Sequence, residues 1–363
     1  MPYYSTTKSR VCPPFLLCEI KIYTEFSYTS QIALFAVDFG IDKWYNLYNM
    51  KRINTKIHRQ VCLSVDLVQW RIKMKPLIYI RKGIIYDRNN RQYDYCLSFA
   101  DVDEVDPQKG ELLLSHGDFE KYITTQKPRG LRLIFETQEE FEYLINIIHP
   151  FVSSIYLHEK HNRAYDLTPL QKCSELEAVQ FYWNTKQETL WDVKKNKKLK
   201  SFHMTDFYKV TDFSALRGSS IETLELFGCN GASSFVSKLH IDDLSFILDM
   251  PHLRALRLDI IKDESSEYYL KLLARCQGLE LFSTPDSFFT FQQFAWLKAH
   301  LPNVKEGLNC VEKYGDDWYG IIGRRTPKTL TDFAKTEKYQ KRYDALVEKY
   351  KFRDTPPSDE EKD

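Results

Sequence analysis

The sequence has 363 residues, of which 43% are hydrophobic and 28% are charged, and its formal net charge is +1. These values are ordinary for a globular protein, and so small a net charge excludes a global attraction to nucleic acid or to a membrane surface. Eight cysteines are scattered without a CxxC pair, so neither a zinc site nor a disulfide framework is predicted. No stretch approaches the ~20 apolar residues of a membrane helix, and two prolines break the apolar run at residues 11–18. We therefore expect neither a signal peptide nor a membrane span, and a cytoplasmic location.

Residues 1–150 indicate a separate α+β domain with a mainly antiparallel sheet. Apolar and alternating runs predict strands at residues 15–23, 32–39, 60–65, 77–80 and 130–135. Two further runs, 83–87 and 92–99, flank a loop with two asparagines, which predicts a β-hairpin. Thr137 and Glu140 form a capping-box pattern before an apolar helical run that Pro150 ends. We expect this helix to cap the repeat segment after it and to shield the first strand of that segment.

From residue 152 to about 304, the pattern apolar-x-x-apolar-x-apolar returns at regular intervals. Its copies begin at residues 152, 176, 199, 221, 253 and 276, with a fading copy at 301, so the starts lie 24, 23, 22, 32, 23 and 25 residues apart. Each copy predicts a short strand that cannot bury its apolar residues alone. Stacking the copies gives one continuous core, and a period of this length is typical of stacked repeats.

In this pattern, and above all in segments 183–200 and 210–216, the sequence resembles the leucine-rich-repeat superfamily, in particular its irregular bacterial cytoplasmic members. The resemblance covers about residues 150–310. It implies an α/β solenoid of short parallel strands with helical connections on the convex side. At the ninth repeat position, where the family has Asn or Cys, Asn184 and Cys229 agree with the pattern. Four copies depart from it, which implies irregular curvature: Lys160, Phe207, Ile261 and Thr284.

The connections and the end of the chain complete the expected organisation. Helical spacing predicts helices at residues 241–248, 268–275 and 288–300, and residues 311–323 are expected to close the solenoid, which spans 151–323. An amphipathic helix at 329–350, within a segment 324–352, is expected to pack on the solenoid, the alternative being a partner-binding helix. The acidic segment 353–363 is predicted to be disordered.

Strand alternation places the fifth and seventh repeat positions on the concave face, which repeat proteins generally use for binding. Arginine, tyrosine and other aromatic residues dominate interface hot spots. The predicted partner-binding residues are the aromatic and charged side chains at these positions: Tyr156, His158, Tyr182, His203, Phe227, Arg257, Asp259 and Phe282.

No catalytic residue, cofactor or metal ligand is predicted, because the sequence has no Walker loop, GxGxxG, GxSxG or HExxH motif. His158 and His161 lie three apart without further ligands nearby. Our hypothesis is a non-catalytic module that binds a protein partner, and the resemblance extends it to an immunity, antitoxin or assembly subunit. Two alternatives remain: an activity in residues 1–150 with the solenoid as a targeting arm, and a nucleic-acid adaptor using the basic run 194–200. The partner and the oligomeric state stay open.

Overall fold

The computed structural model describes residues 77–86, 92–99, 106–158, 163–182, 184, 186–228, 239–314, 318–323, 329–330 and 333–361. By internal contacts the chain divides into two compact units, Met1–Met74 and Lys75–Asp363. The strands predicted at 15–23, 32–39 and 60–65, the hairpin loop, Lys160, His161 and Cys229 lie outside the described residues. All of the described residues belong to the second unit.

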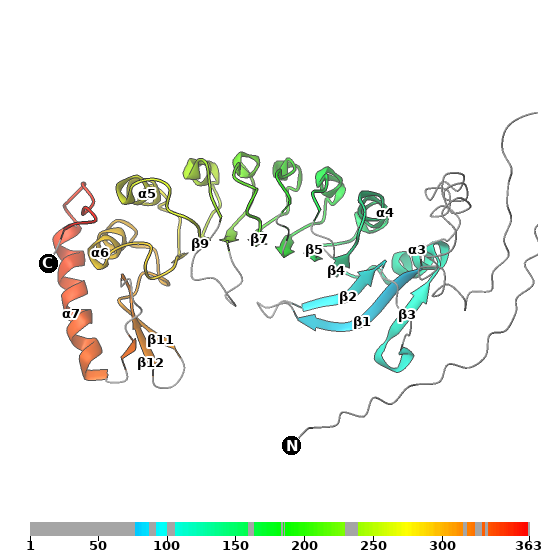
Figure 1. Cartoon of the computed structure of the whole chain (residues 1–363), viewed down its shortest axis with the longest axis horizontal. Coiled ribbons are helices and arrows are strands. Elements are labelled where there is room, and N and C mark those ends of the chain that lie inside the picture. The colour runs from blue at the N-terminus through cyan, green and yellow to red at the C-terminus, as the bar shows by residue number, and fades with distance from the viewer. Residues whose placement is uncertain are drawn as a thin grey trace, which may run out of the picture. The chain divides into compact units, whose positions relative to one another are not determined.

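Ten strands of this unit form one sheet in the order β10-β9-β8-β7-β6-β5-β4-β2-β1-β3 (Figure 1). From β2 and β4 through to β10 all neighbours are parallel, whereas β1 is antiparallel to both β2 and β3. The strands are β1 (Ile78–Tyr86), β2 (Gln92–Ser98), β3 (Glu111–Leu114), β4 (Gly130–Ile134), β5 (Ser154–His158), β6 (Ala178–Tyr182), β7 (Ser201–Thr205), β8 (Thr223–Phe227), β9 (Ala255–Asp259) and β10 (Leu281–Ser283). The predicted hairpin is therefore confirmed, with the two runs at 77–80 and 83–87 joined into the single strand β1.

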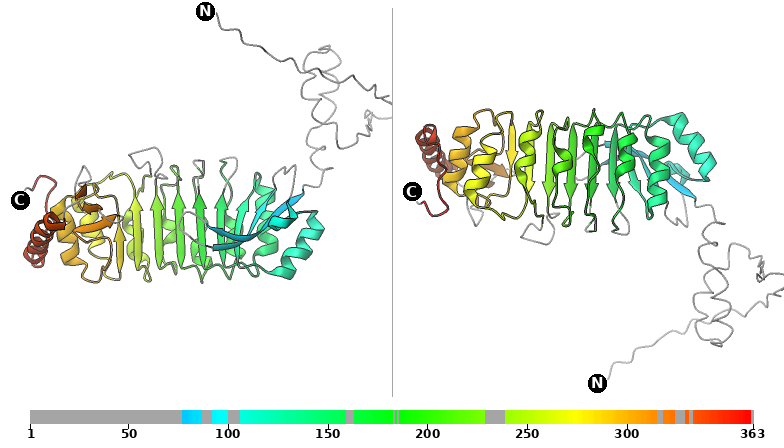
Figure 2. Two further views of the ribbon diagram at one scale, coloured as in Figure 1. Left: turned by 90° about the horizontal axis from the view of Figure 1, so that it is seen from below. Right: turned by 90° about the horizontal axis from the view of Figure 1, so that it is seen from above.

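Helices and 3-10 turns connect the strands and lie over one face of the sheet (Figure 2). They are α3 (His116–Gln126), α4 (Gln138–Ile148), η3 (Thr168–Lys172), η4 (Val193–Lys195), η5 (Ser214–Leu216), η6 (Leu244–Asp249), α5 (Ser266–Leu273) and α6 (Phe291–His300), and a further 3-10 turn, η2 (Pro107–Lys109), precedes β3. The helices expected at 268–275 and 288–300 correspond to α5 and α6, while the one expected at 241–248 is the 3-10 helix η6. The result is a long, mostly parallel α/β sheet of repeat-like units. We call the opposite face of the sheet the outer face.

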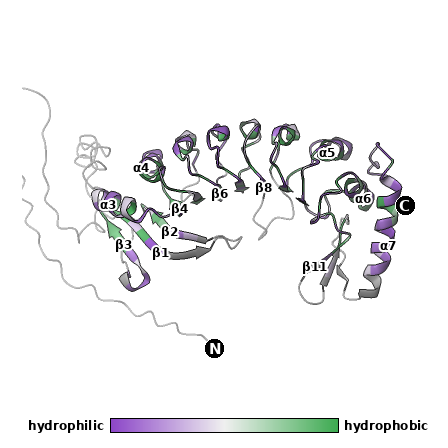
Figure 3. Ribbon diagram, turned by 180° about the vertical axis from the view of Figure 1, so that it is seen from behind, coloured by the Kyte–Doolittle hydropathy of each residue, from purple (hydrophilic) through white to green (hydrophobic). Residues whose placement is uncertain are grey.

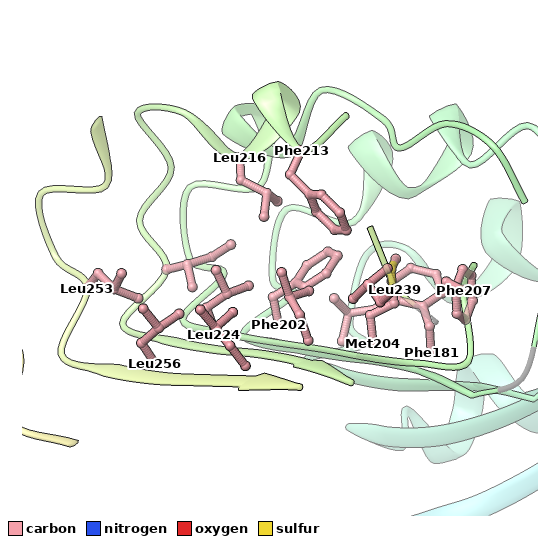
Figure 4. Packing of buried hydrophobic residues seen from close by; sticks show 14 of the residues in the cluster. Phe181, Phe202, Met204, Phe207, Phe213, Leu216, Leu224, Leu239, Leu253 and Leu256 are labelled. Carbon is pink, nitrogen blue, oxygen red and sulfur yellow. The ribbon is translucent and has the colours of Figure 1, made fainter. Parts of the chain in front are cut away.

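The hydrophobic core lies between the sheet and these connections (Figure 4). The fourth and sixth repeat positions point into it, for example Phe202 and Met204 on β7, both with 0% exposure. The ring of Phe181 on β6 lies 5.7 Å from those of Trp191 and Phe202. The inward side chains of adjacent strands thus pack against one another, and units that are too small to fold alone share one core in this way.

Helix α4 begins at the capping box that the sequence predicts, but the parallel sheet already includes strands that precede this helix. Thr137 accepts from the backbone N–H of Glu140, whose side chain bonds back to the Thr137 N–H, so α4 opens with a capping box. However, β4 pairs with β5, with Leu131 opposite Ile155. This corrects both the boundary expected near residue 150 and the shielding role of α4: the first repeat strand is covered by β4. The alternation in β4 was visible in the sequence, but β4 belongs to no periodic copy.

At the other end, the chain closes with a small sheet and a long helix. Strands β11 (Val311–Tyr314), β12 (Trp318–Ile321) and β13 (Thr329–Leu330) form an antiparallel sheet. Helix α7 (Phe333–Tyr350) is mostly hydrophilic (Figure 3) and packs on α6 through Tyr343, whose ring lies 5.3 Å from that of Phe291. The Tyr343 hydroxyl also donates to the Leu308 carbonyl at 3.0 Å. This packing agrees with the preferred interpretation of the amphipathic stripe.

Residues 353–361, predicted to be disordered, instead fold back against the end of the sheet unit. Pro356 and Pro357 are buried, and Arg353 holds both carboxylate oxygens of Glu361 at 2.7 and 2.8 Å. The acidic composition predicts a solvated chain, but Asp359 and Glu361 have specific donors that composition does not reveal. Among the described residues, every helix is too short or too polar to traverse a lipid bilayer.

Candidate functional site on the outer sheet face

The strand register places outward-facing side chains in continuous rows across the sheet. One row, called the middle row, crosses from β1 to β10 and consists of Arg81, Cys96, Arg132, Tyr156, Gln180, His203, Glu225, Arg257 and Ser283. A second row lies two residues further along each strand of β5–β9. This terminal row consists of His158, Tyr182, Thr205, Phe227 and Asp259. Seven of the eight predicted residues therefore lie in two adjacent rows.

The eighth, Phe282, does not belong to the outer face. It pairs with Leu256, an inward position, and its exposure is 0%. The sixth copy was predicted to begin at Cys276, whereas in the structure it begins at Leu279, with Phe282 as its fourth position. Ser283 takes the outer place, opposite Arg257.

A backbone ladder confirms this register. The N–H of each second repeat position donates to the preceding second-position carbonyl, as Arg254 does to Glu222, Glu280 to Arg254 and Lys305 to Glu280, all at 2.8 Å. Gly307 comes next, at φ +86°, and a Cβ there would lie 1.7 Å from the Phe282 carbonyl oxygen. Only glycine lets the chain approach the edge strand so closely.

Tyr156 lies beneath other side chains rather than at the surface. The Arg132 guanidinium sits over its ring at 5.3 Å, and the Tyr93 ring lies 5.7 Å away. Tyr93 comes from the β1–β2 hairpin, which crosses this part of the outer face (Figure 2), and its hydroxyl donates to Gln180 at 3.4 Å. The hairpin leaves Tyr156 only 6% exposed and Gln180 only 3%. Tyr156 was predicted as a contact residue, but here it supports the surface.

His203 is likewise buried, at 4% exposure, within a polar network. Its Nδ1 lies 2.5 Å from a Glu225 oxygen and its Nε2 lies 2.8 Å from the Thr205 hydroxyl. An ionised carboxylate only accepts hydrogen bonds, so this contact matches a His203 ring that carries a proton on Nδ1. The hydroxyl, imidazole and carboxylate stand in the order used by nucleophilic enzymes, yet Thr205 is only 6% exposed. The geometry indicates mutual satisfaction of buried polar groups rather than a hydroxyl presented to a substrate.

Arg257 links this network to the surface. One guanidinium nitrogen lies 3.5 Å from Glu225, whose side chain is 7% exposed, while the Arg257 side chain is 44% exposed. The Phe227 ring lies 5.4 Å from the His203 ring, so it covers the network from the terminal row. Beside it, partial burial raises the pKa of Asp259 above its usual range.

Within β5–β9, the partly exposed members of the two rows define the accessible surface of the site. The imidazole of His158 stacks on the Tyr182 ring at 5.4 Å, and Phe227, Arg257 and Asp259 lie further along, across β8 and β9. We call these five residues the contact set. Three predicted residues lie outside it: Tyr156 and His203 are buried beneath it, and Phe282 is in the core.

Two residues of the site lie outside the repeat pattern and were not predicted. Arg132 and Tyr93 come from strands before the first repeat, where no periodic copy exists. The alternation of Leu131 and Leu133, both 0% exposed, around Arg132 was a usable signal for Arg132. Nothing in the sequence indicates that Tyr93 reaches Tyr156, because that contact depends on the path of the hairpin.

Within the described part of the chain, no group of three or more His, Cys, Asp or Glu side chains is placed to hold a metal ion. No protein-family model matches the sequence, and a search of curated proteins finds no significant match.

Proposed function

We propose that this chain is a leucine-rich-repeat solenoid that binds a protein partner, without catalysis, through the outer face of its sheet as the concave surface. The observation that carries the proposal is the contact set: five partly exposed aromatic, imidazole and charged side chains, in two adjacent rows over five parallel strands in unbroken register. An immunity, antitoxin or assembly role is the specialisation that the family resemblance suggests.

The size of this surface suits the centre of an interface. The middle row, the terminal row and the outward row two residues before the middle row lie about 7 Å apart across β5–β9, whose strands lie about 4.8 Å apart. This part of the outer face therefore extends over about 19 by 14 Å, or roughly 270 Å². A specific interface buries about 800 Å² on each partner. The contact set would therefore supply the central anchors, with neighbouring loops completing the rim.

Rigidity beneath the contact set favours binding. Arg257 is held by Glu225, Phe227 packs against His203, and His158 stacks on Tyr182. Side chains already fixed lose little conformational entropy when a partner docks, and this raises affinity.

The basic run 194–200 favours a protein partner over nucleic acid. Lys198 lies 2.7 Å from Glu175 and Lys200 lies 3.1 Å from Glu222. These lysines have acidic neighbours across the repeats, so the run does not form a continuous positive stripe of the kind that phosphate binding uses.

The test is affinity capture by the tagged full chain from lysate of its source cells, read by mass spectrometry. One variant carries Phe227→Ala and Arg257→Glu. A matched control carries the same types of change on the helix-covered face, Tyr268→Ala and Arg275→Glu. We expect a protein captured by the wild type and the control but lost by the first variant. Equal capture by both variants would rule out the outer face, and the first unit would become the place to look.

A further inference from the structure

The segment Arg353–Glu361, called the strap, lies against α5 and α6 in the manner of a bound peptide. The indole Nε1 of Trp296 donates to the Arg353 carbonyl at 2.7 Å. The amide Nε2 of Gln293 donates to the Pro357 carbonyl and to the Asp359 carboxylate, both at 3.0 Å. The same carboxylate oxygen accepts from the Ser266 hydroxyl at 2.5 Å and lies 3.8 Å from the Lys262 ammonium.

The two sides of this contact have opposite chemistry. In these contacts α5, α6 and Lys262 supply only donors: an indole N–H, an amide NH₂, a hydroxyl and an ammonium. The strap supplies only acceptors, two main-chain carbonyls and one carboxylate. Proteins generally recognise an extended peptide in this way: fixed side-chain donors bind its main-chain carbonyls, and one charged group binds a side chain of opposite charge.

The donors are fixed independently of the strap. The Oε1 of Gln293 accepts from the Thr290 N–H at 2.9 Å in the capping box of α6. Because the amide oxygen is committed to the helix start, Nε2 must point to the strap. Lys262 is held by the Phe288 carbonyl at 3.0 Å, and Trp296 stacks on His300 with ring centroids 4.0 Å apart.

The strap is itself suited to act as a ligand. Pro356 and Pro357 restrict its backbone to an extended conformation, which lowers the entropy lost on docking. The bidentate Arg353–Glu361 pair closes its ends. Hydrogen bonding to Arg353 lowers the pKa of Glu361, so this carboxylate stays ionised at neutral pH.

We propose that Lys262, Ser266, Gln293 and Trp296 form a second interaction site, which binds an extended Pro-Pro-x-acidic segment of a partner polypeptide and which the chain fills with its own strap. This site is separate from the outer face and does not rest on the function proposed for that face. A tethered ligand has an effective concentration of about 1 mM. If a free segment binds with a Kd of about 10 µM, the strap weakens its apparent affinity about 100-fold.

The experiment measures binding of a dye-labelled peptide of residues 353–361, with blocked ends, to the full chain by fluorescence polarisation. A strap-disabled chain carries Pro356→Gly, Pro357→Gly and Asp359→Lys. We expect it to bind the peptide at least 10-fold more tightly than the wild type does. A peptide with Asp359→Lys should not bind.

Gln293→Glu, added to the strap-disabled chain, is the matched site variant. Glutamate keeps the capping-box acceptor but removes both Nε2 bonds and repels Asp359, so peptide binding should be lost while circular dichroism stays unchanged. Equal binding to the wild-type and strap-disabled chains, or full binding to the Gln293→Glu chain, would overturn the proposal. So would failure of the strap-disabled chain to fold, because an exchangeable ligand cannot be essential to the fold.

Discussion

Replacing Phe282 with alanine tests the corrected register of the sixth repeat. Its ring is fully buried in the core beneath β10, the edge strand of the sheet. A phenylalanine buries roughly 150–250 Å², which at about 25 cal/mol per Å² is about 4–6 kcal/mol as an upper bound on the free energy of burial. Measured Phe→Ala substitutions in cores cost about 3–5 kcal/mol, and we expect a loss in this range.

The matched control is Ser283→Ala on the adjacent, outward position, where we expect a change within about 0.5 kcal/mol. Urea unfolding is followed by circular dichroism and by tryptophan fluorescence, to which the buried Trp296 in nearby α6 contributes. If circular dichroism and fluorescence give the same unfolding transition, the protein unfolds in one step and the free energies can be compared. A loss below about 1 kcal/mol for Phe282→Ala would refute the register and restore the outward placement of this side chain.

Three further outcomes are expected. Thr137→Ala should lower the free energy of unfolding by about 1 kcal/mol, because it removes the acceptor for the Glu140 N–H in the capping box, and Thr137→Ser should restore most of the loss in the same urea assay. Cys173 and Cys310 should resist iodoacetamide at pH 8 until the chain unfolds, as read by peptide mass spectrometry, since burial raises the pKa of each thiol to about 12; rapid native alkylation would contradict this. Burial also raises the folded-state pKa of Asp259, so the contribution of this group to stability is greatest below the unfolded pKa of about 3.9 and falls as pH rises through the folded pKa. The melting temperature of Asp259→Asn, measured relative to that of the wild type, should therefore increase between pH 3 and pH 7. A difference in melting temperature that does not change with pH would count against this.

Local and periodic signals in the sequence were sufficient for much of the fold. The capping box at Thr137 is a contact between neighbouring residues, and its pattern is specific. The inward positions of β5–β9 follow from a period that repeats with little change. In both cases the information lies within a few residues, or recurs often enough to reinforce itself.

Prediction failed where two matches compete or where the contact is distant in sequence. Cys276 and Leu279 both begin acceptable copies, and only the larger burial of Phe282 decides between them. Strand β4 has alternating inward and outward residues but belongs to no periodic copy, so the repeat pattern predicts a parallel sheet that begins only at β5. The strap has an acidic composition typical of disorder, and its ordering depends on Gln293, 64 residues from Pro357. For the candidate site, the rows were predictable, but the burial of Tyr156 by Tyr93 was not.

The central claim is that a protein partner docks on the outer face, and hydrogen–deuterium exchange on the complex with the captured partner tests it most directly. The contact set predicts slower exchange in peptides covering the carboxyl ends of β5–β9, with little change in α5 and α6. Protection confined to α5, α6 or the first unit, with β5–β9 unchanged, would contradict the account.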